Sequence, residues 1–287
     1  MRNLGIIVIV AVAMFAEPAA DQAAGARSSI PRFDVASVKA NVGGSGSTSY
    51  VRWSPKGVVA VNYPLQYVIA EAYEIAAPFI KYRIVGGPAR ILSMRVDLDA
   101  IAPAGASEKD RRAMLRSLLA ERFKLRVQPE LRMTAVYELT TIKNRQLGQE
   151  LRASRHNCDE IFELLREQQK RPADGLEPPR DAKGRALCWI RQADDPTPRG
   201  AFRVRNAGTI VRLITDTQAF IDRPIVDATG LAGNFEWQLV FNPVGDNSSE
   251  FPSILTAFEE QLGLKLQPRR MRLEVLVIES LEAPSPN

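Results

Sequence analysis

The sequence predicts an α+β fold of two related halves, each a mostly antiparallel sheet with helices packed on one side. Several short segments alternate apolar and polar residues with the period of a strand, and others space their apolar residues as one helical stripe. The same order of elements returns in the second half of the chain. Strands with one polar face and helices with one apolar stripe suit a sheet that helices cover on one side.

The chain begins with the features of a secretory signal peptide. Arg2 precedes an apolar run from Leu4 to Ala16, and small residues that include Ala24-Gly25-Ala26 follow. The run is shorter than the roughly 20 apolar residues of a membrane span. We therefore expect a signal peptide over 1–26, a periplasmic or secreted protein, and no transmembrane segment after cleavage. The alternative is that the same run is retained as an N-terminal anchor.

The composition is that of an ordinary globular protein, with 45% hydrophobic residues, 25% charged residues and a net charge of +5. This charge is mild and scattered, so together with export it argues against nucleic acid as a partner. The chain contains no P-loop, no dinucleotide-binding fingerprint and no cluster of metal ligands at typical spacing. We therefore expect neither a cofactor nor a metal site.

The first repeat is expected to span residues 33–143, and local patterns predict its elements in order. After a first alternating strand, a glycine- and serine-rich stretch is typical of a loop, and Ser54–Gly57 has the composition of a hairpin turn. Asn62 stands where it could cap the next helix. The predicted elements are strands over 33–39, 50–53, 58–61, 82–85 and 94–99, and a helix from Pro64 or Leu65 to Tyr73.

A capping box marks the start of the main helix of this repeat. Ser107 and Asp110 stand three residues apart, and Met114–Phe123 then keep helical spacing. Pro129 is expected to end the strand after this helix, because proline cannot donate to a ladder. The strands predicted here are 124–128 and 134–142.

Residues 144–200 form a predicted insertion in which charge rises and the apolar pattern thins. It contains the only two cysteines, Cys158 and Cys188, and the only histidine, His156. In an oxidising compartment an isolated pair of cysteines favours one disulfide, here closing a loop of about 30 residues. Two free thiols are the alternative, and a zinc site with His156 is a weak one because the ligand spacing is not typical.

The second repeat is expected over 201–282, with a tail over 283–287. Glu260–Pro268 matches Glu121–Pro129 at a constant offset of 139 residues, and in both repeats an amphipathic helix precedes this segment. A strand that contains Phe235, Trp237 and Leu239 matches Met94, Val96 and Leu98 at an offset of 141, and Phe202-Arg203 with Gly208 matches Val51-Arg52 with Gly57 at 151. These matches predict an internal duplication.

Three carboxylates invite a catalytic interpretation. Asp97 and Asp99 lie two apart on one strand, where they could share a proton or a cation, and Asp227 could join them in a hydrolase or transferase. The alternative is that Asp97 and Asp99 form the solvated face of a half-buried strand. With a single histidine, a histidine-assisted nucleophile would have to use His156, which lies in the poorly patterned insertion.

The turn over 222–233 is the best remaining candidate for a site. It carries four polar side chains on a backbone that Pro224, Gly230 and Gly233 shape. One interpretation is a ligand or partner patch, with an arginine that contacts an anion. The other is structural, with the aspartates bonded to the turn backbone. The four candidate binding residues are Asp222, Arg223, Asp227 and Thr229.

Six ordered motifs together resemble the Solibacter-type family, an uncharacterised secreted domain found in acidobacteria. The motifs are Phe33–Lys39, Gly86–Pro88, Met114–Leu125, Asp222–Gly233, Glu260–Leu264 and Val275–Ile278. The chain departs from the family pattern at Arg90, where an aromatic residue is usual, and at Ala228, where a basic residue is usual. The resemblance implies an extracytoplasmic sensing or docking role and supplies no catalytic residue.

These observations predict a non-enzymatic, extracytoplasmic protein that binds a protein or another component of the cell envelope. Sheet edges in two repeats offer strand addition as the mode of binding, since this mode depends on backbone more than on special side chains. The alternative is a carboxylate-based hydrolase or transferase, which would need polar side chains from distant segments to converge in one pocket.

Overall fold

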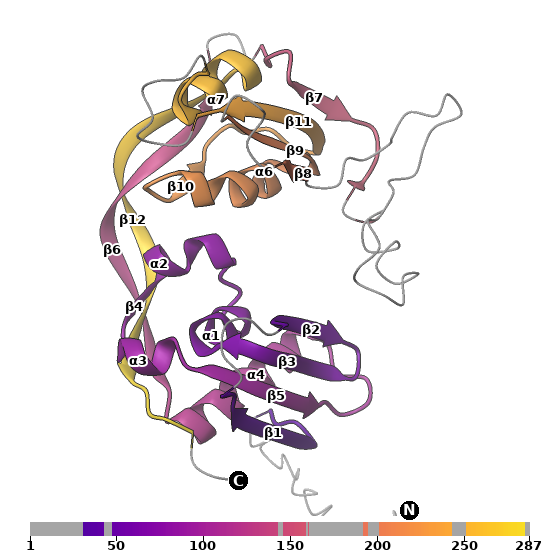
Figure 1. The fold of residues 1–287 in the computed structure, drawn as a ribbon, viewed down its shortest axis with the longest axis vertical. Coiled ribbons are helices and arrows are strands. Elements are labelled where there is room, and N and C mark those ends of the chain that lie inside the picture. Colours follow the sequence, from indigo (N-terminus) through magenta and orange to yellow (C-terminus); the bar gives the residue numbers. More distant parts are fainter. Residues whose placement is uncertain are drawn as a thin grey trace, which may run out of the picture. The chain divides into compact units, whose positions relative to one another are not determined.

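The computed structural model describes most of the two predicted repeats and shows a mixed α+β architecture (Figure 1). The residues it describes form part of one compact unit, residues 31–287. The predicted signal peptide, Cys188 and most of the predicted insertion lie outside the described residues. The described residues are 31–42, 48–142, 146–158, 160, 192–194, 201–242 and 251–284.

Four strands of the first repeat form an antiparallel sheet, which we call the N-terminal sheet. Its strand order is β1-β5-β3-β2, and the short β2–β3 hairpin uses the turn predicted from the sequence. The two longer helices of this repeat pack on one face of the sheet (Figure 1). The elements are β1 (Val35–Ala40), β2 (Tyr50–Ser54), β3 (Gly57–Pro64), β5 (Arg95–Ile101), α1 (Leu65–Ala72) and α4 (Glu108–Phe123).

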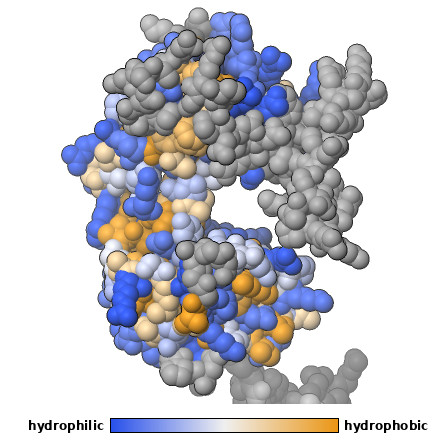
Figure 2. Space-filling model, viewed as in Figure 1, coloured by the Kyte–Doolittle hydropathy of each residue, from blue (hydrophilic) through white to orange (hydrophobic). Residues whose placement is uncertain are grey.

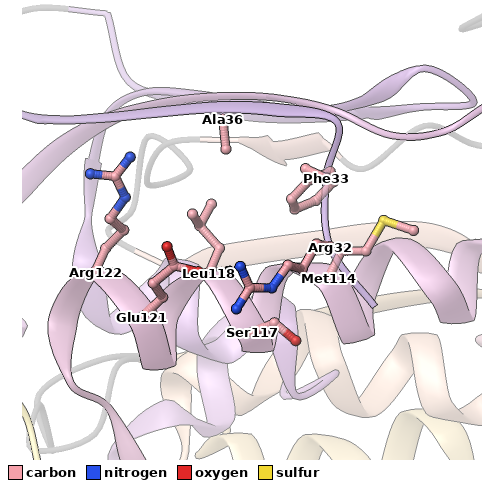
Figure 3. A pocket seen from close by; sticks show the side chains of 8 residues that line it. All are labelled: Arg32, Phe33, Ala36, Met114, Ser117, Leu118, Glu121 and Arg122. Carbon is pink, nitrogen blue, oxygen red and sulfur yellow. Dashed lines mark ion pairs between the residues drawn. The ribbon is translucent and has the colours of Figure 1, made fainter. Parts of the chain in front are cut away.

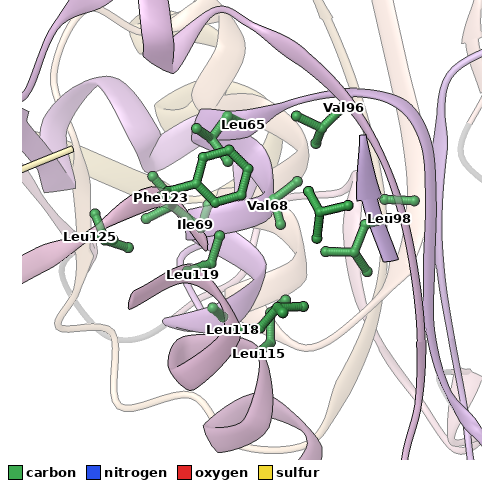
Figure 4. Close-up of a cluster of buried hydrophobic side chains, with 14 of the residues drawn as sticks. Leu65, Val68, Ile69, Val96, Leu98, Leu115, Leu118, Leu119, Phe123 and Leu125 are labelled. Carbon is green, nitrogen blue, oxygen red and sulfur yellow. The ribbon is translucent and has the colours of Figure 1, made fainter. Parts of the chain in front are cut away.

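The apolar side chains between this sheet and its helices form a first core (Figure 4). Phe123, Leu119 and Ile69 are completely buried in it. The predicted alternation in β5 is confirmed, because Val96 and Leu98 face this core. The predicted capping box is confirmed as well, because both of its reciprocal hydrogen bonds are present at the start of α4.

A second antiparallel sheet, which we call the C-terminal sheet, combines two strands of the predicted second repeat with two short strands of the predicted insertion. Its order is β7-β11-β9-β8, with two helices against it, and the second core lies between them. Trp237 is 1% exposed in this core, as its place on the apolar face predicts. The elements are β7 (Leu151–Ser154), β8 (Gln192–Asp194), β9 (Phe202–Gly208), β11 (Asn234–Phe241), α6 (Ile210–Thr217) and α7 (Ile254–Leu262).

A third sheet takes strands from both repeats, and we call it the shared sheet. Two long strands, β6 and β12, pair antiparallel along their length, and each also pairs in parallel with a short strand from the other repeat: β10 with β6, and β4 with β12. Apolar side chains gather over α2 and β4 beside this ribbon (Figure 2). The elements are β6 (Arg126–Thr141), β12 (Leu264–Ser280), β4 (Ile84–Gly86), β10 (Ile225–Asp227), α2 (Ile80–Arg83), α3 (Ala89–Leu92) and the 3-10 turns Ala77–Phe79 and Gln218–Phe220.

The shared sheet corrects the prediction of two separate strands around Pro129. Residues 126–141 form one continuous strand. The bond from Ile142 N to Gly263 O fixes the register, so that even-numbered residues of β6 bond to β12 and Pro129 does not. Its missing N–H therefore costs no bond to β12. The predicted start at Lys124 is also too early, because Lys124 ends α4 in the left-handed conformation.

Asn62 is not the helix cap that the sequence predicts. It lies within β3 with a positive φ of 50°, where the register of β3 against β5 shifts, and Pro64 stands at the start of α1. The strand therefore runs to the helix without a gap. The predicted alignment of Gly57 with Gly208 is wrong. Gly57 opens β3 after a hairpin, whereas Gly208 closes β9, so the two glycines stand at opposite ends of their strands.

Candidate functional site

The polar side chains of the predicted turn site bond mainly within the turn itself. Asp227 accepts hydrogen bonds from the backbone N and the hydroxyl of Thr229, at 2.9 and 2.8 Å, and the Thr229 hydroxyl accepts one from Leu231 N. Thr229 is buried and Asp227 is exposed. These bonds are those of a side chain that mimics a backbone turn, so both residues have a local structural role.

Arg223 and Asp222 form the second half of this turn. Their ion pair measures 3.4 Å, and the Arg223 guanidinium lies over the ring of Tyr137 at 5.2 Å from its centroid. Gln218 fixes the backbone here, because its side chain donates to Arg223 O and accepts from Ile225 N. The structure thus brings the four predicted residues together, but as bonded pairs along one loop.

The three candidate carboxylates do not share an environment. Asp97 in β5 accepts two bonds from Asn41 Nδ2 and one from Asn62 N, which stabilise the irregular stretch of β3. Asp99 is exposed on the same strand, and Asp227 belongs to the shared sheet. The carboxylate of Asp97 is therefore occupied by local contacts that a catalytic base would have to give up.

The predicted insertion contributes few described residues. Cys158 is fully buried, His156 is exposed, and Cys188 lies outside the described residues. Within the described part of the chain, no group of three or more potential ligands could hold a metal ion. The backbone N of His156 donates a hydrogen bond of 3.3 Å to the hydroxyl of Ser154.

A pocket that the sequence analysis did not predict lies between β1 and α4 (Figure 3). Its volume is about 170 Å³. Phe33 and Ala36 line it from the strand side, and Met114 and Leu118 line it from one face of α4. Half of the eight side chains that line the pocket are therefore apolar, two from the strand side and two from α4.

The rim of this pocket is polar and carries an excess of positive charge. Arg32 and Glu121 form an ion pair of 3.6 Å, with side chains 67% and 54% exposed. Arg122 also borders the pocket and forms no ion pair with any described residue. Ser117 completes the rim, and its hydroxyl donates to Ala113 O within the helix. The rim therefore holds two guanidinium groups and one carboxylate.

The backbone of β1 opens toward the same side. Asn41 N donates to Arg95 O, which sets the odd-numbered residues of β1 toward β5. In an antiparallel pair the residues between them turn their N–H and C=O groups outward, and in β1 these are Ala36, Val38 and Ala40. β1 is an end strand of its sheet among the strands described. An open strand edge thus runs beside the pocket.

The sequence gives only a faint signal for this pocket. Arg32 and Phe33 precede the first strand, whereas Leu118 and Arg122 stand more than eighty residues later on a helix. Each residue taken alone is typical of a strand end or of a helix surface. The one local sign is that Leu118 and Arg122 lie one helical turn apart, which puts an apolar and a basic residue side by side.

Comparison with known proteins assigns a family. A model described as "Protein of unknown function (DUF3738)" matches residues 66–281, about three quarters of the chain. The chain belongs to this family. The match includes α4 and most of the pocket lining but begins after β1. The acidobacterial origin that the resemblance implies stays a prediction.

The other comparisons add no relative. No curated protein and no solved structure matches the chain. Within the residues that the structure describes, no helix has the length and apolar character needed to cross a membrane. The geometry of the pocket and of the β1 edge is therefore the basis for a functional proposal.

Proposed function

We propose that this chain is a non-enzymatic, extracytoplasmic binding protein that takes up an extended segment of another envelope protein as an added strand beside β1. The observation that carries the proposal is the edge of β1, which turns the backbone groups of Ala36, Val38 and Ala40 outward next to the pocket. Strand addition uses such an edge for affinity and neighbouring pockets for specificity.

Export is part of this proposal. The apolar run over 4–16 and the small residues before Arg27 favour a signal peptide, which would bring the protein to the periplasm or the cell exterior. The predicted disulfide between Cys158 and Cys188 fits that compartment. It is supported by Cys158, which is fully buried and is not a free thiol.

We also propose that the two repeats arose by duplication. The orders β1-β5-β3-β2 and β7-β11-β9-β8 correspond strand by strand. Lys124 and Gly263, which the offset of 139 residues aligns, both end a helix in the left-handed conformation before a long strand. The alternative function, a carboxylate-based hydrolase or transferase, has less support because Asp97 and Asp227 are bonded within different sheets.

The test compares two substitutions of one exposed residue. Ala40→Pro removes an outward N–H from β1 and leaves the bonds to β5 in place, whereas Ala40→Ser keeps the N–H. The exported protein and both variants are crosslinked in envelope extract, and the partner residues joined to β1 are identified by mass spectrometry. We expect one partner segment, captured by the protein and by Ala40→Ser and lost with Ala40→Pro. Equal capture by all three forms, or crosslinks that avoid β1, would refute strand addition at this edge.

A further inference from the structure

We propose that the pocket between β1 and α4 receives one apolar side chain of the bound segment, and that Arg122 with Arg32 receives a carboxylate next to it. This inference rests on the proposed function and specifies its ligand. The carboxylate belongs to an acidic side chain of the same segment, because a segment that continues along β1 as an added strand does not end at the pocket.

The size of the pocket favours a single side chain over a whole small molecule. Its volume is about 170 Å³, whereas sites for small molecules usually measure about 300–1,000 Å³. An aliphatic or aromatic side chain fits a space of this size and would replace water over Leu118 and Phe33. Anchors of this kind provide most of the binding energy in many protein interfaces.

The geometry of strand addition directs such a side chain into the pocket. Side chains of Ala36 and Val38 point to the face of the sheet that α4 covers, since Ala36 lines the pocket and Val38 is buried in the first core. In an added strand, every second side chain points to that same face. A segment paired with β1 therefore presents alternate residues to α4.

The charges on the rim favour a carboxylate in the ligand. The ion pair between Arg32 and Glu121 is exposed and longer than a hydrogen bond, so solvent weakens it. Arg122 has no carboxylate among the described residues. A guanidinium group binds a carboxylate through two parallel hydrogen bonds, which makes Arg122 the stronger candidate of the two arginines.

Three small probes separate the apolar contribution from the charged one. The exported protein is titrated by NMR with N-acetyl-L-leucine, with N-acetyl-L-leucinamide and with N-acetylglycine. We expect the leucine acid to bind best and its amide to bind about tenfold more weakly, the difference that one charged hydrogen bond makes. N-acetylglycine should not bind measurably because it has no side chain for the pocket. Equal binding of acid and amide would refute recognition of a carboxylate by the arginines. Equal binding of N-acetylglycine and N-acetyl-L-leucine would refute the insertion of an apolar side chain into the pocket.

Two neighbouring substitutions on α4 give effects of opposite sign. Arg122→Gln should remove the preference for the acid over the amide, whereas Glu121→Gln should increase it, because it removes the competing carboxylate. Both positions are at the helix surface, so loss of folding does not mimic either result. An unchanged preference in Arg122→Gln would refute the role of this arginine.

The source of the carboxylate and the mode of binding are tested separately. N-acetyl-leucyl-glycyl-aspartyl-amide carries its carboxylate on a side chain two residues after the leucine, which an extended segment turns to the same face. Stronger binding than N-acetyl-L-leucine supports an internal acidic residue, and weaker binding overturns it. The Ala40→Pro experiment reports on strand addition alone. If the acid binds in the pocket while Ala40→Pro still captures the partner, strand addition fails and the pocket assignment stands.

Discussion

Phe123→Ala should destabilise both cores, although Phe123 belongs only to the first. The side chain is fully buried at the end of α4, and removal of a buried phenylalanine ring costs about 3–5 kcal/mol. The loss affects both cores because one long strand contributes side chains to each of them. Leu276 and Ile278 of β12 lie in the first core, whereas Leu264 and Leu266 of the same strand lie in the second.

Trp237 provides the assay, because it is buried in the second core. In a background with Trp53 and Trp189 replaced by phenylalanine, its fluorescence reports unfolding of the second core, and far-UV circular dichroism reports the whole chain. Phe123→Ala should lower both denaturation midpoints together, with a fall in melting temperature of about 10 °C. Leu131→Ala, at a side chain that is 63% exposed, serves as the control and should change little.

A Trp237 midpoint that stays at the value of the background protein while the circular dichroism splits into two transitions would refute this reasoning. It would show that the second core unfolds independently and that the shared sheet does not couple the two. If Phe123→Ala lowers the free energy of unfolding by less than about 1 kcal/mol, the neighbouring side chains have instead moved to fill the space of the lost ring.

Four further outcomes follow from local contacts. Arg112→Ala loses a cation–π contact with the Trp53 ring, 5.0 Å away, and a hydrogen bond to the carbonyl of Glu71 at the end of α1. Chemical denaturation should therefore show a free energy of unfolding lower by about 2–3 kcal/mol. Gly57→Ala should prevent stable folding, seen as loss of soluble protein, because φ is +145° and a Cβ would overlap a carbonyl oxygen of β5. Hydrogen bonds at the helix cap lower the pKa of Asp110, so the stabilising effect of its carboxylate is lost as the pH falls through that pKa. In Asp110→Asn the melting temperature should therefore fall less at acid pH than in the unsubstituted protein. Burial raises the pKa of Tyr73 above 10.0, so stability should fall as the pH rises past that value, and less so in Tyr73→Phe.

The sequence allowed prediction of the elements whose signals are local. The capping box at Ser107 and the apolar stripe of α4 need only neighbouring residues, and both are confirmed. Pro129 was misinterpreted because its effect depends on which side of β6 faces β12, and that register is set by a distant strand in which Leu276 stands opposite Pro129. Asn62 failed as a cap for the same reason, since its conformation is fixed by Asp97 on another strand.

Of the two candidate sites, the turn could be predicted from local sequence and the pocket could not. The turn around Asp227 could be predicted because a short side chain bonds to its own backbone, which turn composition reveals. The pocket could not, because it needs residues 32–36 around the start of β1 and the distant helix α4 in one place. No single residue of the pocket departs from what a strand end or a helix surface usually carries.

The exchange of short strands explains why the repeats are expected to act as one body. β4 belongs to the first repeat but pairs with β12, and β10 belongs to the second but pairs with β6. A repeat by itself would leave an unpaired edge on its long strand and would lack apolar side chains that the other repeat supplies to its core, such as Leu276 in the first core and Tyr137 in the second. Because unpaired buried backbone is costly, the two predicted repeats depend on each other for stability.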